Sequence, residues 1–191
     1  WLLEPYEDRK DFFGQNTFSM DELGKIAEFA WEKNLQLCVH AIGDRANRET
    51  INIFSEQIKK DKSKDHRWRV EHAQHVNPVE IPRFKEWNVI ASMQAIHCTS
   101  DAPFVEKRLG AKRAAEGAYM WKAFMNAGVV VTNGTDVPVE NINPIACYYA
   151  AVTRKQKNGV AFYPDQRMTR EEAVYSYTMA NAFAAFEEKQ K

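Results

Sequence analysis

Residues 35–44 read LQLCVHAIGD, in which a short apolar run ends in His40, turns at Gly43 and reaches Asp44. The run predicts a strand, and Asp44 can begin the helix that follows it. A strand that feeds directly into a helix is a β/α unit, and α/β barrels carry their chemistry at the carboxyl ends of such strands. The stretch therefore favours an α/β fold with His40 at a functional edge.

The same layout occurs twice further along the chain. Residues 68–72 (WRVEH) end in His72, and residues 129–136 (VVVTNGTD) end in Asp136. The carboxyl ends of parallel strands meet at one edge of a sheet, where neighbouring strands are about 4.8 Å apart. We therefore expect His40, His72 and Asp136 to lie close together.

Two imidazoles and a carboxylate are good ligands for Zn²⁺ and similar divalent ions, so this set indicates a metal site. Each residue also has a structural interpretation. The histidines can be buried polar residues that bond to their neighbours. Asp136 can cap a helix or form a turn after Asn133 and Gly134.

Hydrophobic spacing and capping signals divide the rest of the chain into alternating strands and helices. Strands are predicted at residues 35–40, 67–72, 89–94 and 129–135, helices at 20–33, from 44, and at 77–87, 111–127, 143–155 and 170–187, and a long loop at 95–103. The alternation favours a parallel sheet covered by helices. Four strands are half the number in a closed (β/α)8 barrel, which takes about 250 residues.

The composition is that of an ordinary globular protein, with 45% hydrophobic residues. The 26 basic and 26 acidic residues cancel, which argues against nucleic acid or an anionic membrane as a partner. Three widely separated cysteines predict reduced thiols and a cytoplasmic protein. Export is left open, because the chain opens on Trp1 rather than Met.

Two further residues follow the third predicted strand and are candidates for contact with a substrate. His97 falls in the predicted loop, where it could hydrogen-bond a substrate or a developing oxyanion, or simply be a bystander. Gln94, at the end of the same strand, is the weaker candidate.

Several motifs together resemble the metal-dependent amidohydrolase superfamily, in the branch of formamide deformylase-like and exoenzyme-regulator-like hydrolases. The matching stretches, which cover most of the chain in order, are LLEPY (2–6), HAIGDRA (40–46), RVEHAQ (69–74), ASMQAIHCTSD (91–101), GTDVPVE (134–140) and MTREEA (168–173). One departure is Ala95, where the branch usually has proline.

The resemblance implies a fold and a ligand set. Members hold one or two metal ions at the carboxyl end of a (β/α)8 barrel, so His40, His72 and Asp136 would be the ligands of strands five, six and eight. The His-x-His of strand one, the lysine of strand four and the flanking β-sandwich have no counterpart in these 191 residues. Residues 1–191 would therefore be a single incomplete domain, the C-terminal half of the catalytic barrel.

The implied activity is hydrolysis of a non-peptide carbon–nitrogen bond, of amide or formamide type, by a metal-activated water, with Asp136 as both ligand and proton acceptor. Zinc is the expected ion, and a small amide-type molecule the expected substrate. Two alternatives remain: a deaminase of the same superfamily, and a non-catalytic half-barrel that is inactive alone. We expect the isolated chain to be inactive, and to pair with a second copy or with the missing half through its open sheet edges.

Overall fold

The structure, a computed structural model, describes residues 1–190. The strands are β1 (Cys38–Ala41), β2 (Arg69–His72), β3 (Ile90–Met93) and β4 (Val131–Asn133). The helices are α1 (Met20–Glu32), α2 (Asp44–Ile58), α3 (Ile81–Glu86), α4 (Ala95–Leu109), α5 (Ala111–Gly117), α6 (Trp121–Asn126), α7 (Pro144–Thr153), α8 (Arg170–Tyr177) and α9 (Met179–Ala184), with short 3-10 turns at Pro78–Glu80 and Pro164–Gln166.

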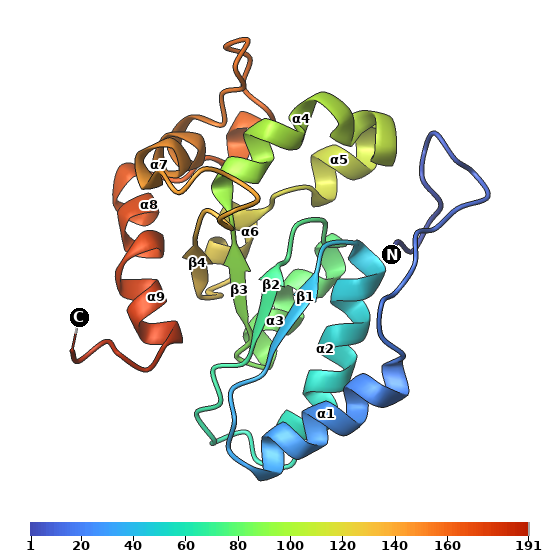
Figure 1. The fold of residues 1–191 in the computed structure, drawn as a ribbon, viewed down its shortest axis with the longest axis vertical. Coiled ribbons are helices and arrows are strands. Elements are labelled where there is room, and N and C mark those ends of the chain that lie inside the picture. Colours follow the sequence, from blue (N-terminus) through green and yellow to red (C-terminus); the bar gives the residue numbers. More distant parts are fainter. Residues whose placement is uncertain (191) are drawn as a thin grey trace.

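The four strands form one parallel sheet in the order β1-β2-β3-β4 (Figure 1). One row of residues crosses it from Val39 through Val70 and Ala91 to Val131. The expected α/β architecture with a parallel sheet is thus confirmed. Each strand pairs with the next along the chain, which is the order found in a (β/α)8 barrel. Since β3 leads straight into α4, the carboxyl ends of the strands point toward α4, α5 and α7.

Large aromatic side chains hold the helices against the sheet. Trp68, just before β2, is fully buried, with its ring centroid 5.6 Å from that of Trp31 in α1 and 4.9 Å from that of Phe54 in α2. Its Nε1 donates to the Leu35 carbonyl at 2.9 Å, so the indole is buried without an unmet donor. Burying a side chain of this size stabilises a fold by roughly 1.5–3 kcal/mol.

The predicted loop at 95–103 is wrong, because these residues form the first part of α4. Buried residues in α4 follow spacings of three and four positions, as one face of a helix requires: Ala95, Cys98, Ala102, Val105 and Leu109. Pro103 inside the helix removes one backbone donor, but the buried face outweighs that loss. The helix fixes His97 to a rigid element rather than to a loop.

The predicted helix at 111–127 is two helices, because the chain between them pairs with the segment after β2. The Tyr119 N–H donates to the Gln74 carbonyl at 2.7 Å, and the Val76 N–H donates to the Gly117 carbonyl at 2.9 Å. The last predicted helix is likewise divided, at Thr178, where φ is −121° and ψ is −85°. The first break follows Gly117, where a Cβ would lie only 2.8 Å from the Val76 carbonyl oxygen, so a glycine marks it in the sequence. The second break has no glycine or proline beside it and could not be seen in the local sequence.

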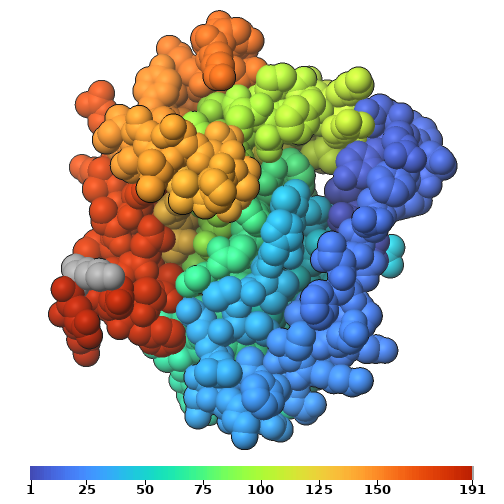
Figure 2. All heavy atoms as spheres, in the orientation of Figure 1, coloured from blue at the N-terminus to red at the C-terminus, as the bar shows by residue number. Residues whose placement is uncertain are grey.

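The N-terminal segment lies along one side of the molecule and reaches α4, where the Glu7 N–H donates to the Arg108 carbonyl at 2.7 Å (Figure 2). Between this segment and β1 there is a cavity of about 670 Å³, lined mainly by apolar side chains such as Phe18, Leu23 and Val39. Within residues 1–190, no helix is long and apolar enough to cross a bilayer.

Candidate metal centre

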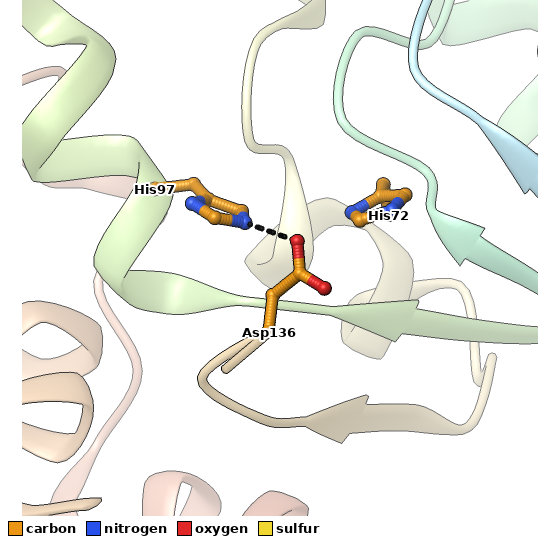
Figure 3. Close-up of side chains that lie close together, drawn as sticks. All are labelled: His72, His97 and Asp136. Carbon is orange, nitrogen blue, oxygen red and sulfur yellow. Dashed lines mark hydrogen bonds and ion pairs between the residues drawn. The ribbon is translucent and has the colours of Figure 1, made fainter. Parts of the chain in front are cut away.

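Three side chains converge at the carboxyl edge of the sheet (Figure 3). His72 is the last residue of β2, Asp136 follows β4, and His97 lies in the first turn of α4. Each offers one ligand atom, and these atoms all lie within 4.8 Å of one another. The Nε2 atom of His97 is 3.2 Å from Oδ2 of Asp136, and His72 lies on the other side of that carboxylate.

The backbone at this edge is strained. His72, Ala73 and Asp136 have φ values of 76°, 44° and 58°, in the left-handed region that non-glycine residues rarely adopt. A residue other than glycine in this region destabilises the fold by on the order of 1–3 kcal/mol, and such residues cluster at functional sites. The left-handed conformation at these residues turns the chain sharply after β2 and after β4, at the positions of the candidate ligands His72 and Asp136.

Gln94 lies at the site, and its amide oxygen faces His72. Oε1 of Gln94 is 2.8 Å from Nδ1 of His72, while Nε2 of Gln94 donates to the Ser92 carbonyl at 3.3 Å. Since the amide nitrogen already has an acceptor, the amide oxygen is the group turned to His72, which places the ring proton on Nδ1. The Nε2 lone pair of His72 is then the one available to an ion. The substrate contact predicted for Gln94 stays a prediction.

Asn133 ties the end of β4 to three helices behind the site, α4, α7 and α9. Its Oδ1 accepts from the Ala95 N–H at 3.0 Å and from the Cys147 thiol at 3.4 Å. Its carbonyl accepts from Nδ2 of Asn181 at 2.9 Å. Since Ala95 begins α4, Asn133 at the end of β4 fixes the start of the helix that carries His97. The sequence prediction placed Asn133 in the strand at 129–135 and before a turn, but gave it no role at the site.

Glu140 is a second residue that the sequence prediction missed. Its Oε1 lies 3.5 Å from Nδ1 of His97 and accepts from the Ser100 hydroxyl at 2.5 Å. The available signal was its place at the end of the GTDVPVE motif, four residues after Asp136. Nothing in the local sequence shows that it meets a helix 40 residues earlier.

His40 lies beside the group of three but is not a member of it. Its ring centroid is 4.5 Å from that of His72, with the rings nearly perpendicular. The pKa of His40 is lowered, first because its ring is partly withdrawn from water and then by the neighbouring His72, while the Asp136 carboxylate opposes both effects. The structure therefore brings His72 and Asp136 together as expected, with His97 rather than His40 completing the closest set.

The arrangement fits a divalent cation. Two imidazoles and a carboxylate form a donor set that binds Zn²⁺ well, and catalytic zinc sites keep a further position open. The site lies at the sheet edge rather than in the core, since the Asp136 side chain is 34% exposed, so a small molecule can approach it.

Two curated relatives match nearly all of this chain. It is 33% identical to the protein LONG AFTER FAR-RED 3 of Arabidopsis thaliana, over 97% of this chain and 32% of the relative. It is 30% identical to the putative amidohydrolase YtcJ of Bacillus subtilis, over 100% of this chain and 36% of the relative. The chain thus spans about a third of the length of these relatives.

A solved structure has a similar fold. An uncharacterised metal-dependent hydrolase from Pyrococcus furiosus superposes with a TM-score of 0.84 at 32% identity, over 98% of this chain and 37% of that one. The sequence also matches the amidohydrolase family over residues 1–191. The chain belongs to the amidohydrolase family.

Proposed function

We propose that this chain supplies part of a metal-dependent hydrolytic centre that cleaves a carbon–nitrogen bond other than a peptide bond, of amide or formamide type. The observation that carries the proposal is the convergence of His72, His97 and Asp136, with their ligand atoms within 4.8 Å of one another at the carboxyl edge of a parallel sheet. Family membership supports hydrolysis of amide-type bonds.

His72 and Asp136 would hold the ion, which we propose to be zinc because imidazole and carboxylate suit it. The third ligand would be a second imidazole, either that of His97, which lies in the closest set, or that of His40 beside His72. When bound, a divalent ion lowers the pKa of a water toward about 7 and polarises a carbonyl oxygen.

Asp136 would act as the proton carrier. Its carboxylate would take a proton from the attacking water as the new C–O bond forms, and would then deliver that proton to the leaving nitrogen as the C–N bond breaks. One water and one amide give one carboxylic acid and one amine, so the reaction balances with no further reactant. Where His40 supplies the third ligand, Nε2 of His97 is free to donate a hydrogen bond to Oδ2 of Asp136, 3.2 Å away, and would keep its carboxylate turned into the site.

The finer assignment is that the chain forms strands five to eight of the catalytic barrel, in the formamide deformylase-like branch. Two observations support it: the strand order, and the motifs that end in His40, His72 and Asp136. The outer edge of β1 pairs with no strand within residues 1–190, and the apolar cavity lies beside it. We propose that a strand from a second copy or from the rest of a barrel pairs there.

The test is hydrolysis of a panel of N-substituted formamides, acyl amides and amidines by the full-length protein and by this chain alone. We expect the full-length protein to release amine from the first two classes, to lose activity on chelation and to regain it with added Zn²⁺. Activity that survives complete metal removal would contradict the proposal. Ammonia release from amidines alone would assign a deaminase instead, and turnover by this chain as a monomer would contradict the pairing at β1.

A further inference from the structure

Tyr119, between α5 and α6, has a backbone conformation that is unusual for a bulky residue. Its φ is 56°, in the left-handed region that glycine and asparagine adopt more readily, and its side chain is buried. Such a conformation persists only where the surrounding contacts hold it, and it is commonest at functional sites. The contacts of the Tyr119 side chain therefore indicate what this conformation serves.

The Tyr119 hydroxyl joins two side chains that come from different elements. It donates to Oδ2 of Asp101 in α4, and it accepts from Nε2 of Gln74, in the turn after β2, at 2.6 Å. Nε2 of Gln74 also donates to Oδ2 of Asp101 at 2.9 Å, so each of the three side chains is bonded to the other two. Burial and the Asp101 carboxylate raise the pKa of Tyr119 well above its usual value, so the hydroxyl keeps the proton that it donates.

Main-chain contacts strengthen this group, which we call the Tyr119 clamp (Gln74, Asp101 and Tyr119). The Tyr119 N–H donates to the Gln74 carbonyl at 2.7 Å, and the Tyr119 carbonyl accepts from the buried guanidinium of Arg154 at 2.8 Å. Tyr119 therefore holds Gln74 through both the main chain and the side chain. Tyr119 is itself fixed from the other side by Arg154.

Each end of the Tyr119 clamp lies next to a candidate ligand. Gln74 comes two residues after His72, across the left-handed turn at His72 and Ala73. Asp101 comes one helical turn after His97 in α4, on the same face of that helix. The rings of the two histidines have centroids 6.1 Å apart. The clamp thus ties the turn that carries His72 to the helix that carries His97.

We propose that Tyr119 is a positioning residue, whose hydroxyl fixes the turn after β2 against α4 and so holds His72 and His97 at the spacing of the candidate metal centre. Tyr119 acts through Gln74 and Asp101 and contacts no reacting atom. Its value to catalysis rests on the proposed function, whereas the link between the turn and the helix does not.

Zn²⁺ titration of the metal-free full-length protein tests the effect on the metal centre. Tyr119→Phe removes only the hydroxyl, because the ring that packs against Trp121 is kept. We expect this variant to bind Zn²⁺ about tenfold more weakly, at the low end of the loss that follows removal of groups that orient ligands. Tyr163→Phe is the matched control, since its hydroxyl donates to another carboxylate of α4, that of Glu106, further along the helix from the site. The control should bind Zn²⁺ as the wild type does.

Hydrogen exchange of the same metal-free protein measures the clamp without an ion. The His75 N–H donates to the Ile42 carbonyl at 2.8 Å, and the Val76 N–H donates to the Gly117 carbonyl at 2.9 Å. In Tyr119→Phe we expect these two amides to exchange about 2–10-fold faster, as the loss of one hydrogen bond predicts. Amides of β3, which the clamp does not contact, should keep their rates, whereas a general loss of stability would raise the rates across the sheet.

The outcomes separate the two proposals. A folded Tyr119→Phe with wild-type Zn²⁺ affinity, or with unchanged exchange at His75 and Val76, would overturn the role of Tyr119. If Tyr119→Phe fails to fold, Asp101→Ala opens the same clamp from α4 and should give both effects, and wild-type values there would overturn the role. If the wild type neither binds Zn²⁺ nor hydrolyses amides, but the two amides exchange faster in Tyr119→Phe, then the proposed function fails while the positioning by Tyr119 stands.

Discussion

Replacing Asp136 with asparagine is expected to lower kcat of the full-length protein in the proposed hydrolysis by about 10³-fold or more, since a positioned proton carrier alone contributes about 10²–10⁴-fold. The amide of asparagine has the same shape as the carboxylate but cannot accept the proton of the attacking water. It is also a weaker, uncharged ligand for a divalent ion. Both effects act in the same direction.

The fold should tolerate this substitution, which makes the result interpretable. Asp136 has a φ of 58°, and asparagine is one of the few residues that adopts this conformation readily. Steady-state kinetics on the best substrate of the panel measures the loss, and unfolding by urea should show little change in stability. Asp165→Asn, in the exposed 3-10 turn at Pro164–Gln166, is the control and should keep its activity. An Asp136→Asn enzyme with more than about a tenth of the wild-type kcat would exclude the role given to Asp136.

The second large effect is expected in stability, at Arg154. This arginine ends α7 and is fully buried, with its guanidinium 4.3 Å from the centroid of the Trp121 ring. Its Nε donates to the Phe162 carbonyl at 2.5 Å, and one terminal nitrogen donates to the Tyr119 carbonyl at 2.8 Å. Burial lowers its pKa, yet an arginine keeps its charge in proteins. One side chain thus joins three segments of the chain.

Arg154→Ala should lower the free energy of unfolding by about 3 kcal/mol or more, because it leaves two buried carbonyls without donors at about 1–3 kcal/mol each and opens a cavity. Relief of the buried charge offsets part of this loss. Arg154→Met is the matched control, since it fills the space but donates no hydrogen bond, and it should fall between the alanine variant and the wild type. Because both variants keep a side chain at a φ of 52°, the backbone strain cancels in the comparison. Urea denaturation measures the difference, and an alanine variant within about 1 kcal/mol of the wild type would show that these contacts contribute little.

The strands could be predicted from the sequence because each is an apolar run that ends in a polar residue. This pattern also identified His72 and Asp136, since a parallel sheet delivers strand ends to one edge. The same pattern predicted His40 as a ligand equally with His72, because sequence position cannot show that the ring of His40 lies outside the closest group. Which histidine approaches Asp136 depends on how α4 packs.

The rest of the site depends on contacts between distant parts of the chain. Pro103 and the polar residues before it concealed the three-and-four spacing of α4, so His97 was assigned to a loop. Glu140 has an ordinary local sequence, and it becomes significant only where it meets His97 and Ser100. Asn133 likewise depends on a contact with the start of α4, 38 residues earlier. Local spacing contains no information about any of these contacts.

The most direct test of the metal centre is anomalous X-ray diffraction at the zinc edge from crystals grown with Zn²⁺. We predict a peak at the carboxyl edge of the sheet, about 2.0–2.2 Å from a ring nitrogen of His72 and from a carboxylate oxygen of Asp136, with His97 or His40 as a further ligand. Zinc bound only elsewhere on the molecule, with no peak between His72 and Asp136, would contradict the account.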